Sequence, residues 1–204
     1  LGWSERRATK AAQKLPTNHK KILEEVFLQE AHIIRDHAVP AALRINTNQT
    51  QLVYQQGSDS TWNKHGVKQV ATMGQEEKRA FTLVPSISAS DVLLPMQAVF
   101  GGKTMASCPS PAAPWYDEAI TLGYSMVPST TGTYWSNHGT IHDLVDGIIA
   151  PYFEATKKKL GLLSTQDSIW KIDCWSVHKF KPFLDWMKEH HPHIIVLFVP
   201  GGCT

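Results

Sequence analysis

Two short segments of the chain each place a polar side chain at the end of a run of apolar residues. Residues 44–50 read RINTNQT and carry Asn48, and residues 170–178 read WKIDCWSVH and carry Asp173 and His178. Converging carboxylates at strand ends can hold two divalent ions about 3.5–4 Å apart and so cleave a phosphodiester bond. Since Mg²⁺ prefers carboxylate oxygens, Asp173 is the candidate metal ligand. Asn48 is its candidate neighbour, and His178 could orient a substrate.

Each of these residues also has a structural interpretation. Asp173 could end a strand and cap the following helix. Asn48 could be a turn asparagine, which strand ends often carry. His178 could begin a helix and make a structural hydrogen bond. The site interpretation is preferred for Asp173 and Asn48, whereas both interpretations of His178 stay open.

The composition sets wide bounds on the class of protein. The 204 residues are 42% hydrophobic, which suits one domain with a normal buried core. A net charge of +2 neither requires nor excludes a nucleic-acid partner. Cys108, Cys174 and Cys203 are widely spaced, which indicates reduced thiols in an intracellular protein. No apolar stretch approaches the roughly 20 residues that span a bilayer, and residues 1–20 are too polar for a secretory signal. Because the chain opens at Leu1, we expect a fragment of a longer protein.

Apolar periodicity predicts the elements that must position these residues. A helix capped by Thr17 or Asn18 should run to about Asp36, and Pro40 should end that segment. Residues 1–16 carry basic side chains among alanines and are expected to be a solvated helix or a linker. Alternating or continuous apolar runs predict strands at residues 43–45, 51–55, 67–71, 80–88, 93–100, 168–174 and 194–199.

The second half of the chain reads as an insertion followed by strand–helix–strand units. Residues 101–139 form a long Gly-, Ser- and Pro-rich insertion. Helices are expected at residues 140–160, with a kink or break at Pro151, and at residues 181–190. Pro85 should place its strand at an edge or a bulge. Early hairpins followed by such units predict an α/β fold, in which helices cover a mixed sheet.

Three further groups of side chains could contact ligands, and each has a plainer interpretation. The lysines at 157–159 could bind phosphates, although such runs are usually a solvated helix end. Trp115, Tyr134 and Trp135 could stack on bases, although packing of the insertion onto the sheet is preferred. The histidines of residues 190–193 lack the ligand spacing of a zinc site and read as an exposed loop.

Several segments taken together resemble the DDE transposase family related to pogo and Tigger elements. Residues 46–50, NTNQT, resemble its N-x-D-E-T segment, and Asp173 with His178 resembles its D-x-x-x-x-H motif. Residues 199–204, VPGGCT, resemble the stretch before its third motif, Q-P-x-D. The chain looks closer still to the DDE-1 domains of fungal transposon-derived proteins at residues 74–83, 133–136, 150–153 and 173–178. The resemblance covers essentially the whole chain.

This resemblance implies an RNase H-like fold with a long insertion before the strand that carries the second acidic residue. Residues 1–40 would be a helical lead-in segment, and residues 41–204 a DDE domain truncated at its C-terminus. The family cuts and joins transposon DNA with Mg²⁺ or Mn²⁺. The resemblance therefore implies a DNA partner, a nuclear location, no membrane association and a capacity for homo-oligomers.

Two departures from the family pattern argue against catalysis by this chain. By position, Asn48 occupies the first acidic site and Asp173 the second, and the third would lie beyond Thr204. An amide oxygen is a weaker ligand for a hard cation than a carboxylate. We therefore expect a catalytically dead domain. We also expect low solubility of residues 1–204, because loss of the last helix would expose one face of the buried strand at 194–199. The alternatives are a domesticated, non-catalytic DNA-binding or assembly module and a non-functional transposon relic.

Overall fold

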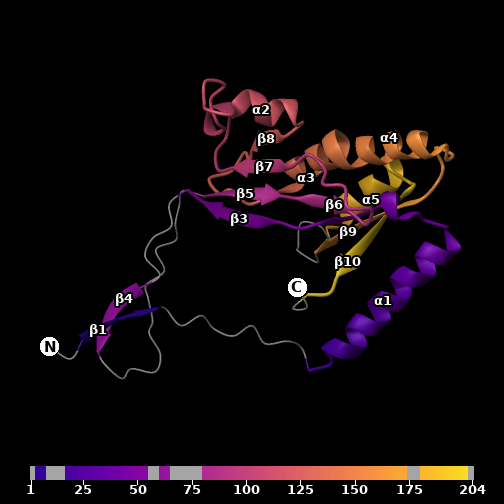
Figure 1. Cartoon of the computed structure of the whole chain (residues 1–204), viewed down its shortest axis with the longest axis horizontal. Coiled ribbons are helices and arrows are strands. Elements are labelled where there is room, and N and C mark those ends of the chain that lie inside the picture. Colours follow the sequence, from indigo (N-terminus) through magenta and orange to yellow (C-terminus); the bar gives the residue numbers. More distant parts are fainter. Residues whose placement is uncertain (1–2, 8–16, 55–59, 65–79, 174–179, 202–204) are drawn as a thin grey trace.

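The computed structural model describes residues 3–7, 17–54, 60–64, 80–173 and 180–201. Two four-stranded mixed sheets lie at its centre and are flanked by helices (Figure 1). The prediction of an α/β fold with mixed strands under helices is therefore confirmed, although the strands are divided between two sheets. The strand predicted at 67–71 lies outside the described residues.

The first sheet has the strand order β10-β9-β2-β6. Parallel pairs join β10 (Ile194–Val199) to β9 (Ser168–Asp173) and β9 to β2 (Arg44–Thr47), and β6 (Ser86–Ser88) runs antiparallel to β2. Helix α5 (Lys181–His190) connects β9 to β10, because parallel neighbours need a crossover. The predicted bounds of β9, α5 and β10 are confirmed to within one residue.

The second sheet has the strand order β3-β5-β7-β8. Its members are β3 (Thr50–Val53), β5 (Ala80–Val84), β7 (Gln97–Phe100) and β8 (Ser125–Pro128). The first three are antiparallel neighbours, and β8 joins β7 in parallel. The strand predicted at 51–55 is confirmed as far as Val53, and the one predicted at 80–88 is confirmed over Ala80–Val84, whereas the strand predicted at 93–100 begins only at Gln97.

Two neighbouring segments of the chain each run from one sheet into the other. Strand β2 continues into β3 through Asn48 and Gln49, and β5 continues into β6 through Pro85. The backbone N–H of Asn48 donates to the carbonyl of Pro85 at 3.1 Å. Since proline has no N–H to give to a ladder, the strand predicted over 80–88 is interrupted there.

One face of the first sheet is covered by a single helical run. It comprises α3 (His138–Leu144), the π-turn η3 (Val145–Ile149) and α4 (Ala150–Leu160). Pro151 lies in the first turn of α4, directly after the π-helical segment η3. The helix tolerates the missing N–H of proline at this position. The predicted break at Pro151 is therefore a change of helical geometry, and the chain does not leave the helix.

The hydrophobic core lies between this helical run, α5 and the first sheet. Its largest side chains are Trp170 of β9, Phe153 of α4 and Phe183 of α5, all at most 1% exposed. The rings of Trp170 and Phe183 meet edge to face, with centroids 6.4 Å apart. Burial of each such ring contributes about 1.5–3 kcal/mol, which makes this the better secured face of the sheet.

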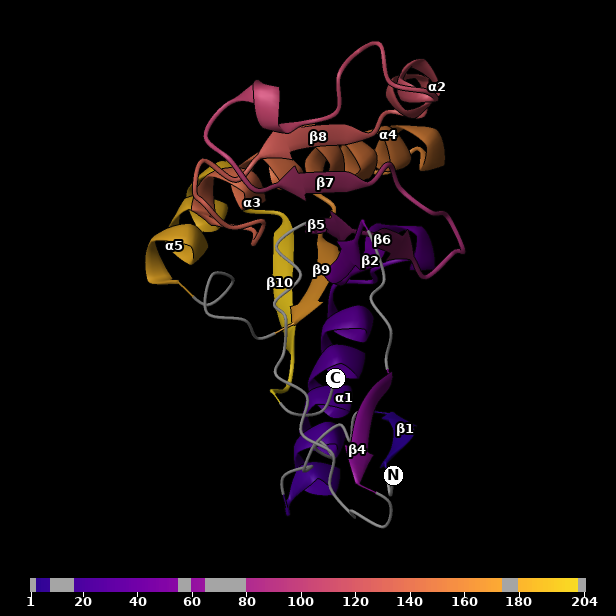
Figure 2. The same ribbon diagram turned by 90° about the vertical axis from the view of Figure 1, so that its left-hand side faces the viewer.

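The opposite face of the first sheet lies toward α1 (His19–Asp36), as Figures 1 and 2 show. The helix was predicted over nearly the same residues. None of its residues is fully buried, although Ile33 and Ile34 pack against the core. Short helix η1 (Ala41–Leu43) then leads into β2. Strand β10, predicted to be buried, lies at the end of the sheet, and only Leu197 is buried in it.

The insertion at 101–139 contains regular structure that the sequence did not reveal. It holds η2 (Met105–Ser107), α2 (Tyr116–Thr121) and β8. Residues 3–7 were expected to be helical or part of a linker, and they instead form β1 (Trp3–Arg7), paired antiparallel with β4 (Ser60–Lys64). Cross-strand pairing has overridden local helix preference there. Among the described helices, none is both long and apolar enough to cross a bilayer.

Candidate functional site

The two residues singled out by motif lie at the ends of neighbouring parallel strands. In the ladder between β2 and β9, Asn46 is paired with Lys171. Asn48 directly follows Thr47, the last residue of β2, and Asp173 is the last residue of β9. Because the two strands are parallel neighbours, both residues lie at the same edge of the first sheet.

Alternation along β2 determines which side chains reach this site. Leu43, Ile45 and Thr47 are buried beneath the helices, whereas Asn46 and Asn48 are exposed on the other face. Successive side chains of a strand point to opposite faces, so Asn46 shares one face with its ladder partner Lys171 on β9. The candidate site thus belongs to the α1 side of the sheet, away from the main core.

Asn48 is held in place by its backbone and by a local contact of its side chain. Its side-chain oxygen accepts a hydrogen bond from the backbone N–H of Gln49 at 2.8 Å. Its own N–H is the donor to Pro85 described above. The amide oxygen, which would be its only metal-binding atom, is therefore already engaged in a strand-end turn of the kind that asparagine favours.

Asp173 is the last residue of β9 and is partly buried. Its backbone pairs with Val199 on β10, so the carboxylate sits at the edge where three parallel strands end. His178, the predicted substrate-orienting residue, lies outside the described residues. The role proposed for it stays a prediction.

Directly behind the site, three buried polar side chains fix the strands to one another. The indole Nε1–H of Trp170 donates to Thr47 Oγ1 at 2.8 Å. Thr47 Oγ1 and Ser86 Oγ lie 2.7 Å apart and share a further hydrogen bond. This chain links β9, β2 and β6 side by side, and the buried polar atoms leave few alternative registers. Sequence reasoning missed it, because one threonine on an alternating strand carries no distinctive signal.

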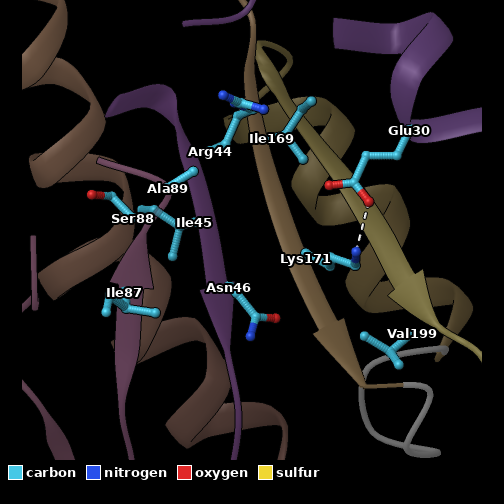
Figure 3. Close-up of a pocket in the computed structure, with 10 residues that line it drawn as sticks. All are labelled: Glu30, Arg44, Ile45, Asn46, Ile87, Ser88, Ala89, Ile169, Lys171 and Val199. Atoms are coloured by element: carbon cyan, nitrogen blue, oxygen red, sulfur yellow. Dashed lines mark hydrogen bonds and ion pairs between the residues drawn. The ribbon is translucent and has the colours of Figure 1, made fainter. Parts of the chain in front are cut away.

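A cavity of about 440 Å³ adjoins the site on the α1 side (Figure 3). Arg44 and Asn46 of β2 line it, together with Lys171 of β9 and Glu30 of α1. Glu30 Oε2 and Lys171 Nζ are 2.6 Å apart, and this ion pair ties the helix to the sheet. The sequence did not single out these residues. The only signal for Arg44, Asn46 and Lys171 was that they share alternate positions of β2 and β9 on the side away from the core.

The residues at this edge do not fit a site for two Mg²⁺ or Mn²⁺ ions. Such a site needs several converging carboxylates, and among the described ends of β2 and β9 Asp173 supplies one carboxylate and Asn48 an engaged amide. Within the described parts of the chain, no group of three or more His, Cys, Asp or Glu side chains could hold a metal ion. No catalytic step through a metal is therefore derived for these residues.

The other residues considered as ligand contacts lie apart from this edge. Lys157 is buried and is bound to Glu154 and to the Ser164 carbonyl, so it cannot reach a phosphate. His191 bonds to Asp146, which leaves it engaged within the fold.

The aromatic residues of the insertion have two different settings. Tyr134 is joined to the second sheet, since Gln51 Nε2 donates to its hydroxyl at 2.6 Å and Thr82 donates to its carbonyl. Its ring also contacts that of Trp135. Trp115 is 80% exposed, so the expected packing onto the sheet is wrong for that side chain.

Comparisons of the chain with family models, with curated proteins and with solved structures gave no match.

Proposed function

We propose that this chain is an RNase H-like domain of the DDE transposase type that binds DNA and does not cut it. One observation carries the proposal. Asn48 and Asp173, which match the first two acidic positions of that family, lie at the same end of adjacent parallel strands: Asn48 directly follows β2, and Asp173 is the last residue of β9. Two motif positions 125 residues apart in the sequence therefore lie at one edge of one sheet, as a shared site would require. The proposal implies a nuclear location.

The order of the strands supports the RNase H-like part of the proposal. The resemblance implies a mixed sheet of about five strands with helices on both faces. Here the chain 44–53 pairs antiparallel with the chain 80–88, which pairs with β7. Strand β9 then joins beside β2, and β10 joins beside β9. The interruptions at Asn48 and Pro85 divide this order between two sheets without changing it.

The chemistry of the site supports the absence of cleavage. A carboxylate at position 48 would bring a second negative charge to the edge where Asp173 lies. Asparagine keeps the size of the side chain and removes that charge, and its oxygen is bonded to the Gln49 N–H. Hard divalent cations bind neutral amide oxygens much less well than carboxylates. We therefore assign the domain a binding role.

A plasmid-nicking assay with the purified chain tests this assignment. In Mg²⁺ or Mn²⁺, we expect no more nicked circles than in a control with a chelator. We also expect salt-sensitive DNA binding that persists in the chelator, because phosphate contacts release counterions and need no metal. Metal-dependent nicking that disappears in Asp173→Asn would overturn the assignment.

A variant that adds a negative charge then tests whether position 48 is a degenerate metal-ligand position or an ordinary strand-end asparagine. Asn48→Asp should bind Mn²⁺ about tenfold more tightly than the unmodified chain, because a carboxylate replaces an amide beside Asp173. Asn46→Asp is the matched control, since it adds the same charge two residues earlier on the same face. Equal Mn²⁺ affinity in Asn48→Asp and Asn46→Asp would show that position 48 has no special relation to Asp173.

A further inference from the structure

The cavity beside the candidate site has walls of two kinds (Figure 3). Apolar side chains line it from three strands, namely Ile87 of β6, Ile169 of β9 and Val199 of β10. Arg44 and Asn46 add a guanidinium and an amide from β2. At about 440 Å³ it is larger than a bare oxyanion needs and lies in the size range of small-molecule sites. A ligand that fills it should join a polar group to a less polar body.

The charges within the cavity do not cancel. Glu30 is paired with Lys171 at 2.6 Å, and these two charges neutralise each other. The guanidinium of Arg44 is left with no carboxylate partner among the described residues. Its Nε is buried, and no acceptor in the described part of the chain bonds to it. Arg44 as a whole is partly exposed and lines the cavity, so its guanidinium carries a positive charge that an incoming anion could pair with.

We propose that this cavity binds the phosphate group of a nucleotide, with Arg44 as its anion partner. Guanidinium groups match phosphate oxygens in shape and charge. The side-chain amide of Asn46 lies next on the same strand face and can donate to a second oxygen. Ile87 and Ile169 would contact the sugar or base. The identification of the phosphate as that of a nucleotide rests on the proposed function, because Asn46 lies two residues from Asn48 on the same face.

Calorimetric titration of the full chain in a chelator tests the cavity with three probes. They are inorganic phosphate, thymidine 5′-monophosphate and a short oligothymidylate. We expect both nucleotide probes to bind more tightly than inorganic phosphate. Arg44→Gln should weaken their binding about tenfold or more, since it removes one charged hydrogen-bond donor. Arg35→Gln is the matched control, because Arg35 is an exposed arginine of α1 that pairs with Asp36 outside the cavity.

A second variant guards against a folding defect in Arg44→Gln. Ile87 is 45% exposed, so Ile87→Glu can add a negative charge at the mouth of the cavity without disturbing the core. It should weaken nucleotide binding as Arg44→Gln does. Circular dichroism spectra of all variants would show whether the fold is retained.

Three results would overturn the inference. The first is that no probe binds the unmodified chain, and the second is that Arg44→Gln and Ile87→Glu bind nucleotides as the unmodified chain does. The third is that inorganic phosphate binds as tightly as the nucleotides, which would make this a site for free oxyanions. If long DNA still binds when these variants have lost the nucleotide, the cavity inference stands and the DNA contacts lie elsewhere. If DNA binding by the unmodified chain fails altogether while thymidine monophosphate binds, the proposed function fails alone.

Discussion

Two adjacent residues at the end of β2, one buried and one exposed, have different roles. Thr47 is 5% exposed, and its hydroxyl joins Trp170 and Ser86 inside the core. Asn48, one residue later, is exposed at the candidate site. The hydroxyl of Thr47 therefore holds β2 against β9 and β6 next to the strand ends that carry Asn48 and Asp173, although it touches neither side chain in the described contacts.

Substitution of Thr47→Val should destabilise the fold by about 1–3 kcal/mol. Valine has nearly the same shape, so the change leaves the buried Trp170 N–H and Ser86 hydroxyl without their partner. Urea unfolding followed by fluorescence measures the loss. Thr121→Val is the matched control, because Thr121 is exposed on α2 and its hydroxyl bonds only to the Asp117 carbonyl there. Equal unfolding midpoints for the two variants would contradict the structural role of Thr47.

At the scale of elements, the end of α4 is anchored by one lysine of a run of three. Lys157 is 2% exposed and donates to Glu154 at 2.9 Å and to the Ser164 carbonyl at 3.0 Å. Lys158 and Lys159 are exposed. The bond to Ser164 holds the turn after the helix, which leads the chain into β9.

Lys157→Ala should therefore cost about 2 kcal/mol or more, whereas Lys158→Ala should stay within about 0.5 kcal/mol. The difference arises from the buried stem of Lys157 and the lost donor to the Ser164 carbonyl. The ion pair to the exposed Glu154 contributes little by itself. Chemical denaturation of both variants at neutral pH provides the comparison. Similar losses in the two variants would mean that Lys157 is not an anchor.

Helices α3 and α5 meet through a histidine stacked on a tryptophan. The rings of His142 and Trp186 have centroids 3.9 Å apart and planes 15° apart. Burial lowers the pKa of His142 from its ordinary 6.5, and the nearby His138 acts in the same direction while Asp146 opposes it. The folded protein therefore binds this proton less readily than the unfolded chain does.

The sign of the resulting pH dependence follows from that lowered pKa. As the pH falls below 6.5, the unfolded chain takes up the proton first, so stability is lost until the folded pKa is reached. The Tm should thus fall between about pH 7.5 and about pH 5.5. His142→Phe keeps the stacked ring without a proton to bind and should reduce that fall. His32→Phe on the exposed face of α1 should leave it unchanged, and an unaltered fall in His142→Phe would refute the assignment.

Local pattern predicted those elements whose periodicity is strong enough to act alone. Helix α5 and strands β9 and β10 were predicted nearly to the residue, because long apolar runs are bounded there by polar residues. Strand β8, with Pro128 at its end, has no such pattern and exists because β7 offers it a parallel ladder. The π-turn before Pro151 depends on packing that no short window of sequence contains.

The sequence predicted the two strand ends of the candidate site, but it did not predict the cavity beside them. Asn48 and Asp173 were identified by motif. Their placement at the same end of neighbouring strands depends on a ladder between distant segments of the chain. Arg44 and Lys171 became relevant only when β6, β9 and α1 enclosed a cavity around them. Residues that line a cavity only because distant segments of the chain meet around them show no recognisable spacing in a single sequence.

The whole molecule is unevenly secured, and the face that carries the candidate site is the weaker one. Three helices bury the opposite face, whereas α1 crosses this face without a fully buried residue. Phe27 is 69% exposed on α1, near the exposed Leu23 and Leu28. In the described part of the chain, β10 is also an edge strand of the first sheet. Exposed apolar side chains beside an open strand favour association between molecules.

The chain should consequently self-associate as its concentration rises, and Phe27→Lys should weaken that association. Lysine removes the most exposed large apolar side chain of α1 and adds a charge that opposes close contact. Sedimentation velocity over a range of concentrations measures the effect. Ile120→Lys is the matched control, because Ile120 is 48% exposed on the short helix α2, outside the first sheet. If the unmodified chain sediments as a monomer throughout, α1 and β10 are sufficient cover for this face, and the expected low solubility has no basis in the fold.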